Sequence, residues 1–280
     1  MTWRRVWVVL AYGVLALIVV LYLFPFFWML STGLKSKAEL YRYPPTVAPA
    51  APTAEAFASV LGRRGYSQLL ANSLVIALAA VAGAIALGLL IAYPLTRLQV
   101  HPGFRRGLFG WILSLRFLPP IVVVIPFFDI VRGFGLYDTR QSLIFLYTVF
   151  CLPFVVWMLK GFLAEVPMEI EEAALVDGAT RLRAFVQILL PQLAPALLAA
   201  AVIAFSLTWS EFMFAFILTA SPTSQTFSIG VASLVTQFEI IWNEMAAAGT
   251  ISALVPVILL LLARRYVVGA LTFGVVREKG

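Results

Sequence analysis

Six stretches of this sequence are long and apolar enough to cross a lipid bilayer as helices. Four of them contain no charged residue, and the other two contain one each. About twenty apolar residues span the hydrocarbon core, and a helix satisfies its own backbone hydrogen bonds there. The pattern therefore predicts an all-α, polytopic membrane protein with six transmembrane helices, within Val6–Leu30, Leu69–Leu95, Leu108–Phe128, Gln141–Leu159, Pro195–Thr219 and Met245–Ala263.

The composition agrees with this class and argues against several others. Apolar residues make up 62% of the chain and charged residues only 12%, which is about half of the charged fraction of a soluble domain. With a single cysteine, Cys151, and a single histidine, His101, the chain offers no internal disulfide, thiolate metal cluster or catalytic triad. The net charge of +7 forms no basic stripe with interleaved aromatic residues, so nucleic-acid binding is not expected.

The chain has no nucleotide-binding motif of its own. The spacing nearest to a phosphate-binding loop, Gly83 to Gly88, is followed by Leu89 and Leu90 within an apolar span. Small residues in such a place serve close contact between helices. We therefore expect no cofactor on this chain, and any ATP-driven activity would take its energy from a separate protein.

Lysine and arginine residues near the span ends indicate the orientation in the membrane. With the N-terminus inside, twelve of them lie on the inner side and seven on the outer side. The first apolar run follows Arg4 and Arg5, but it is longer than the core of a signal peptide and has no clear cleavage site, so we interpret it as a retained anchor. Both termini are therefore expected on the inner side.

The span positions divide the chain into three parts. Residues 1–68 comprise the anchor and a first outer loop, in which Pro44, Pro45, Pro49 and Pro52 favour an extended chain without a folded domain. Residues 69–265 form a core of five spans, and residues 266–280 form a tail.

One polar segment interrupts the apolar sequence at residues 165–195. It contains the only cluster of five acids: Glu165, Glu169, Glu171, Glu172 and Asp177. Pro167 and the acids suit the first turn of a helix, Gly178 breaks the run, and a second amphipathic piece starts near Thr180. We expect Pro191 and Pro195 to stop this second helix, because proline cannot donate the next helical hydrogen bond. The segment predicts helix, turn and helix at the inner membrane surface, a shape suited to docking.

This segment resembles the EAA loop of membrane-spanning subunits of binding-protein-dependent ABC importers. The matching positions are Glu172, Ala173, Ala174, Gly178, Ile188, Leu190 and Pro191, all at the spacing of that motif. The resemblance implies a docking helix that enters a cleft on an ATP-hydrolysing subunit, and its coupling residues would be these seven together with Glu171 and Asp177. The alternative from the residues alone is an ordinary solvated loop helix.

Other fragments are similar to the smaller permease subunit of maltose-type carbohydrate importers. In chain order they are Leu118-Pro119-Pro120 with Pro126, Gly135-Leu136-Tyr137-Asp138-Thr139, Leu152-Pro153-Phe154, Trp209-Ser210-Glu211-Phe212 and the tail from Gly269 to Arg277. The likeness implies type I ABC importer architecture in a bacterial or archaeal cytoplasmic (inner) membrane. It also implies several partners: a second, homologous permease subunit, two ATP-binding subunits that use ATP and Mg, and an extracytoplasmic solute-binding protein. The loop 220–244, with Phe227, Phe238 and Trp242, would reach into that binding protein.

Two ionisable residues lie inside the predicted spans, Arg116 and Glu211. A charge in hydrocarbon is costly unless it is paired or wetted, so they either line a translocation path or form a structural link between helices. Trp209 and Phe212 could stack on a sugar, although packing is the more common role of such rings. The rival to an ABC permease subunit is a stand-alone secondary transporter or channel in which Arg116 and Glu211 relay protons or ions.

Overall fold

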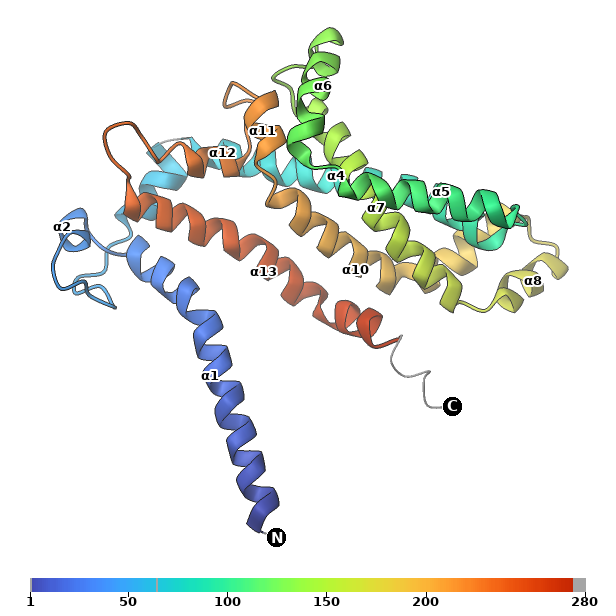
Figure 1. Cartoon of the computed structure of the whole chain (residues 1–280), viewed down its shortest axis with the longest axis horizontal. Helices are drawn as coiled ribbons and strands as arrows, with labels where there is room; N and C mark the ends of the chain where they lie inside the picture. Colours follow the sequence, from blue (N-terminus) through green and yellow to red (C-terminus); the bar gives the residue numbers. More distant parts are fainter. Residues whose placement is uncertain (1, 64, 274–280) are drawn as a thin grey trace. The chain divides into compact units, whose positions relative to one another are not determined.

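The computed structural model describes residues 2–63 and 65–273, and its regular structure is helical (Figure 1). Within these ranges the only β-type pairing is an isolated bridge between Val235 and Ile240. Five helices are long and apolar enough to span a membrane, and a bent pair of shorter helices makes a sixth if it is counted as one span. The all-α, membrane-spanning fold expected from the sequence is confirmed.

The chain divides into two compact units, of which the first comprises residues 1–67 and 230–254. Small residues bring two of its helices close together: a Cβ on Gly33 would lie 3.1 Å from the backbone of Ala247, and one on Gly249 would lie 2.8 Å from Sδ of Met29. Its helical segments are α1 (Thr2–Gly33), α2 (Lys37–Leu40), α3 (Glu55–Ala58), the π-helical turn η1 (Ser59–Arg63) and the first part of α13 (Trp242–Phe273).

Most of the surface of α1 is not covered by other described residues of the chain. The helix is apolar on all sides, and the window that would cross the membrane, within Val6–Gly33, is 0% buried. A helix that is apolar all round is expected to face lipid or another protein. This part of the chain therefore adds little to the core of its own unit.

The first outer loop is less extended than its prolines suggest, because it contains α2 and α3. The carboxylate of Glu39 organises it by accepting hydrogen bonds from the backbone N–H of Ala50 and the hydroxyl of Thr46, both at 2.8 Å. The N–H of Ala50, and then the Thr46 hydroxyl, lower the pKa of Glu39. Sequence alone could not reveal this, since a single glutamate among prolines carries no periodic signal.

The second unit comprises residues 68–229 and 255–280. Its helical segments, some of which begin or end in the first unit, are α4 (Tyr66–Arg97), α5 (Pro102–Ser114), the 3₁₀ turn η2 (Leu115–Phe117), α6 (Pro120–Gly133), α7 (Arg140–Glu165), α8 (Met168–Val176), α9 (Arg181–Ala184), the π-helical turn η3 (Phe185–Leu189), α10 (Leu190–Trp209), α11 (Met213–Leu218), α12 (Phe227–Ala232) and the remainder of α13.

The core of this unit forms where α4, α7 and α10 pack together, through residues such as Val81, Val155 and Phe205 (Figure 1). Glycines on α4 make the packing close: a Cβ on Gly83 would lie 2.9 Å from Oγ1 of Thr148, and one on Gly88 would lie 2.7 Å from Cγ1 of Val155. The contact role predicted for these two glycines is confirmed. A second cluster joins α6, α7 and α11.

The predicted third span, Leu108–Phe128, is not one continuous helix. The helical segment that starts at Pro102 ends at Phe117, α6 begins at Pro120, and the two are bent by 97° at this break. Proline disfavours the helical conformation of the residue before it, and Leu118, which precedes Pro119, is extended at φ −71° and ψ 117°. The predicted third span is therefore a bent pair of helices, and the bend was not predicted because hydropathy reports length and not continuity.

The predicted fifth span, Pro195–Thr219, also has other bounds. Helical structure runs from Arg181 to Trp209, with Pro191 in the first turn of α10 and Pro195 inside it. The expected stop at these prolines was wrong. The π-helical turn η3 ends just before Pro191, so the widened turn lies where the proline ring and its missing N–H would disturb an α-helix.

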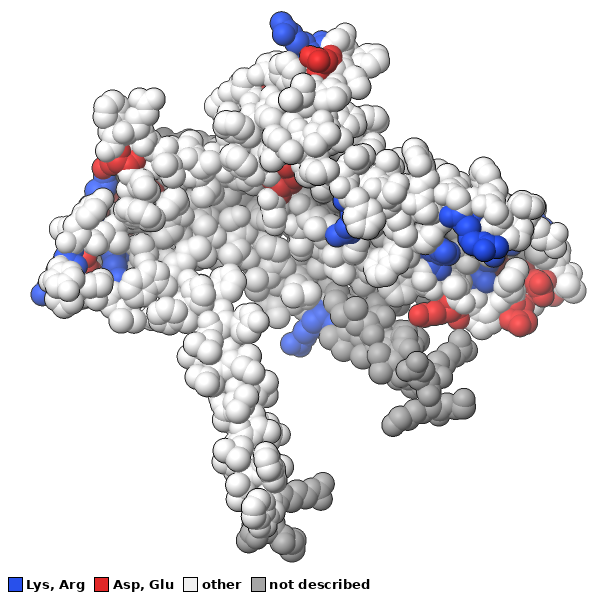
Figure 2. Space-filling view, viewed as in Figure 1, with Lys and Arg blue, Asp and Glu red and all other residues white. Residues whose placement is uncertain are grey.

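Charged side chains gather at the ends of the helices of the second unit. Figure 2 shows basic and acidic groups at the end that carries α8 and at the tip of α6, with a largely uncharged surface between them on this face. A bundle that crosses a membrane requires this distribution, because charges in hydrocarbon are costly.

Candidate functional site

Residues 165–195 contain the expected helix, turn and helix. α8 has Glu169 and Glu171 in its first turn, with Pro167 at the N-cap. It ends in a Schellman turn, in which the N–H of Gly178 donates to the carbonyl of Leu175 at 3.1 Å and the N–H of Ala179 donates to that of Ala174 at 3.0 Å. Gly178 has φ +85°, a conformation that a residue with a Cβ rarely adopts.

The turn leads directly into α9 and η3. Oγ1 of Thr180 accepts a hydrogen bond from the N–H of Arg183 at 3.3 Å and so caps α9. The continuous helical run then passes through Ile188, Leu190 and Pro191 into α10. α8 is therefore joined to a long apolar helix by one tight turn.

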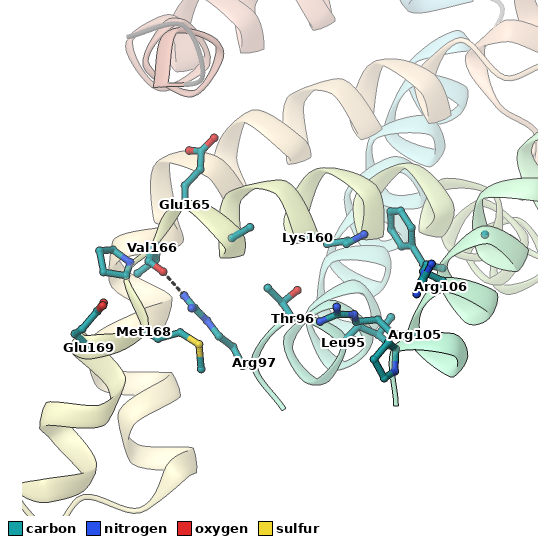
Figure 3. Close-up of a pocket in the computed structure, with 15 residues that line it drawn as sticks. Leu95, Thr96, Arg97, Arg105, Arg106, Lys160, Glu165, Val166, Met168 and Glu169 are labelled. Carbon is teal, nitrogen blue, oxygen red and sulfur yellow. Dashed lines mark hydrogen bonds between the residues drawn. The ribbon is translucent and has the colours of Figure 1, made fainter. Parts of the chain in front are cut away.

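The Glu171 side chain faces its own chain. It is 9% exposed, its Oε1 lies 2.9 Å from Nε of Arg97, and its Oε2 accepts a hydrogen bond from the hydroxyl of Tyr93 at 3.1 Å. Arg97 also donates to the carbonyl of Val166 at 2.7 Å (Figure 3). The Tyr93 ring packs edge-on against Phe185, with the ring centroids 4.8 Å apart. The last turn of α4 is thus tied to the start of α8 and to η3, and we call Tyr93, Arg97 and Glu171 the anchor triad.

The outer face of α8 is open and partly apolar. Glu172, Ala173 and Asp177 are exposed, whereas Ala174 is buried against the chain. Val176 is 87% exposed, and Leu182 on α9 is 72% exposed. α8 and α9 therefore present both acidic and apolar side chains at the surface.

The four residues considered for a translocation path do not form one cluster. Arg116 lies in η2 over the ring of Phe154, 5.2 Å from its centroid, and lines a cavity of about 280 Å³. Trp209 is buried and stacked on Phe205 at 5.4 Å, while Phe212 is stacked on Phe216 at 5.3 Å. Both rings pack against neighbours on their own stretch of chain.

Glu211 lies between α10 and α11 and has partners of its own. Its carboxylate accepts hydrogen bonds from the hydroxyl of Tyr147 at 2.6 Å and from the N–H groups of Phe214 at 3.0 Å and Ala215 at 3.4 Å. It therefore caps α11 and fixes this helix to α7. No ion pair joins Arg116 to Glu211 in the described structure.

Asp138 joins two loops at the other end of the unit. It adopts φ +60° and accepts hydrogen bonds from the N–H groups of Ala220 at 2.8 Å and Ser221 at 3.0 Å and from the hydroxyl of Ser224. Burial alone would raise the pKa of Asp138, but these hydrogen bonds hold it well below its usual range. The α6–α7 loop is thereby fixed to the loop that follows α11.

The fold and the exposed α8 segment define a class: a multispan helical membrane protein with an exposed acidic helix at one end of its bundle. Residues 84–272 match the model of the family described as binding-protein-dependent transport system inner membrane component, and the chain belongs to that family. It is a membrane-spanning permease component of an ABC transport system and not an enzyme.

Characterised relatives cover nearly the whole chain. The sulfoquinovosyl glycerol transport system permease protein of Agrobacterium fabrum is 32% identical and covers 90% of this chain and 88% of its own. The trehalose transport system permease protein of Mycobacterium tuberculosis is 33% identical, covering 91% and 92%. A bacterial ABC transporter involved in the import of alginate has the same fold, with a TM-score of 0.76 over 95% of this chain and 97% of its own at 19% identity. The importer family inferred from the sequence is therefore confirmed.

The contacts of Tyr93 and Arg97 were not predicted. Tyr93 lies inside the predicted span Leu69–Leu95, and Arg97, two residues beyond it, entered only the count of inner-side basic residues. A signal did exist, because the two residues are four apart and so share one face at the end of α4. What the sequence could not supply is the distance to Glu171, which lies more than seventy residues away in the chain.

Proposed function

We propose that this chain is the smaller permease subunit of a carbohydrate importer, and that the outer face of α8 receives the movement of a separate ATPase. Relatives of this chain are transport permease proteins for sulfoquinovosyl glycerol, trehalose, and trehalose/maltose. These names support a sugar or oligosaccharide as the substrate class. The observation that carries the coupling role is the division of α8 into an anchored inner side and an open outer face.

The two sides of α8 suit the transmission of force. The inner side is held to α4 by the anchor triad, and the chain after Gly178 continues into α10. A push on Glu172, Ala173 or Asp177 would therefore move α4 and α10 together, as a lever does. The mechanism places α8 and both termini in the cytoplasm, with ATP and Mg on two partner ATPase subunits and a second, homologous permease subunit completing the path.

We expect the loop 220–244 to meet the extracytoplasmic solute-binding protein, on the other side of the membrane from α8. In the loop 220–244, Phe238 is 96% exposed and Trp242 is 46% exposed, whereas Phe227 is buried. Phe238 and Trp242 are thus the aromatic residues of this loop that a binding protein could cover. The tail from Gly269 to Arg277, which resembles a tail that touches the ATPases in similar importers, lies outside the described residues beyond Phe273.

The test is transport by the purified assembly in lipid vesicles. The chain is purified in mild detergent with the subunits that remain attached, and the uptake of candidate sugars is measured with and without ATP. We expect ATP-dependent uptake that needs both the ATPase and the binding protein. Uptake by this chain alone under an ion gradient would instead support the rival transporter, in which Arg116 and Glu211 act as a relay.

Replacing Gly178 by valine should weaken coupling. The φ of +85° strains any residue with a Cβ, at a cost of about 1–3 kcal/mol, although no neighbouring atom lies within 4 Å of the new Cβ. Gly178→Val should therefore lower ATP-driven uptake about tenfold, since 1.4 kcal/mol corresponds to a factor of ten. Gly178→Asn is the matched control, because asparagine tolerates this conformation better. Equal uptake by both variants and the parent chain would contradict the role of this turn.

A further inference from the structure

A large cavity lies at the end of the second unit where α4, α5 and α7 finish or begin. Its volume is about 1100 Å³, and Figure 3 shows the side chains that line it. The cavity walls mix polar and apolar groups. The basic lining residues are Arg97, Arg105, Arg106 and Lys160, and the acidic ones are Glu165 and Glu169.

Three of the cations have no ion-pair partner among the described residues. Arg97 is paired with Glu171, but no ion pair involves Arg105, Arg106 or Lys160 in the described structure. Nζ of Lys160 lies 3.6 Å from the ring centroid of Phe109, which leaves its charge in place. In Figure 3 these three side chains lie together on one wall, while Glu165 and Glu169 lie at the far end. One wall of the cavity is therefore a basic cluster that no acid of residues 2–63 and 65–273 pairs with.

A phosphate group fits this cluster. Guanidinium groups bind phosphate oxygens with paired hydrogen bonds, and an ammonium group adds a compact charge beside them. The two apolar spans α4 and α7 end at the cavity, at Arg97 and Glu165. In a bilayer spanned by α4 and α7, the cavity would therefore lie at the level of the lipid headgroups.

We propose that the cavity binds the phosphate of an acidic phospholipid headgroup, held by Arg105, Arg106 and Lys160. The bound lipid would link α5 to α7 beside the loop that leads into α8. The cavity is also lined by Arg97 and by the first residues of α8, but the three proposed phosphate ligands lie on α5 and α7 and take no part in the coupling role proposed above.

Native mass spectrometry of the full chain with its attached subunits tests the proposal. The sample is titrated with phosphatidylglycerol and with phosphatidylcholine of the same acyl chains. We expect the acidic lipid to bind at least about tenfold more tightly. Each basic residue near a membrane surface contributes about fivefold to such binding, so the variant with Arg105→Gln, Arg106→Gln and Lys160→Gln should bind phosphatidylglycerol on the order of 100-fold more weakly.

The control variant removes the same charge elsewhere, through Arg42→Gln, Arg132→Gln and Arg264→Gln at exposed positions. It should keep the preference for the acidic lipid. Equal losses in the two variants, or equal binding of the two lipids by the parent chain, would overturn the proposal. Inorganic phosphate is added as a competitor, and displacement of the lipid at millimolar phosphate would assign the cavity to a free anion instead. If the triple variant does not fold, Lys160→Gln alone must weaken binding about fivefold.

Discussion

Replacing Arg97 by methionine should abolish ATP-driven uptake and destabilise the protein by about 3–5 kcal/mol, the usual cost of removing one partner from a buried ion pair. The variant leaves Glu171 buried beside α4 without its cation. It also removes the donor to the carbonyl of Val166. The start of α8 would then lose its hold on α4, so a movement of the ATPase would no longer reach the spans. Thermal unfolding measures the loss of stability, and vesicle uptake measures the loss of transport.

A double variant tests whether Arg97 and Glu171 stabilise the protein as a pair. Arg97→Met combined with Glu171→Met removes both charges, and a buried pair replaced by apolar residues often loses little stability. We expect the double variant to unfold at a higher temperature than Arg97→Met alone. The coupling energy between the two substitutions should be about 2 kcal/mol or more. Arg132→Met, at an exposed position on α6, is the control and should change neither stability nor uptake. Additive effects of the two single variants would show that the pair does not hold α8.

The anchor triad also shows the limit of inference from the sequence. The segment 165–195 could be located from composition alone, because it contains a cluster of five acids in an otherwise apolar chain. The direction of each acid does not follow from composition. Glu171 and Glu172 are neighbours in a short helix, and a rotation of about 100° per residue turns one toward α4 and the other to the surface. The buried one, Glu171, is the one that contacts Arg97 and Tyr93 on α4.

The membrane spans were predictable to different degrees for a physical reason. α7 and the apolar part of α4 follow from uninterrupted hydropathy, which depends only on local sequence. Proline has opposite effects at two places: the helix is interrupted at Pro119, whereas helical structure continues through Pro191 in the fifth span. At Pro119 the preceding residue leaves the helix, whereas before Pro191 a π-helical turn widens it. Which outcome a proline produces depends on the packing of the turn before it.

The charges inside the spans illustrate the same point. Arg116 and Glu211 were the two residues for which the sequence offered a functional and a structural interpretation. The structure gives Glu211 a tyrosine hydroxyl and two N–H groups, and it places Arg116 over an aromatic ring. The carboxylate of Glu211 therefore has three hydrogen-bond donors, whereas the contact of Arg116 with the Phe154 ring leaves the guanidinium charge in place. Sequence spacing could not identify them, because Tyr147 and Phe154 lie on α7, distant in the chain from the groups they contact.

Replacing Val176 by aspartate should abolish docking of the ATPase while leaving the fold of this chain unchanged. Val176 is 87% exposed, so the substitution should alter the free energy of unfolding by no more than about 0.5 kcal/mol. At a protein interface the same change would bury an unpaired charge, and central interface residues carry about 2–4 kcal/mol. Uptake should therefore fall about 30-fold or more, and the ATPase should no longer co-purify.

The matched control for this variant is Val47→Asp, which makes the same substitution at a 55% exposed position in the first outer loop. Because this loop would lie on the opposite side of the membrane from α8, the control should keep both ATPase binding and uptake. Thermal unfolding of both variants separates a docking defect from a folding defect. If Val176→Asp still co-purified with the ATPase and transported at the parent rate, the outer face of α8 would not be the docking surface, and the force would have to enter the spans elsewhere.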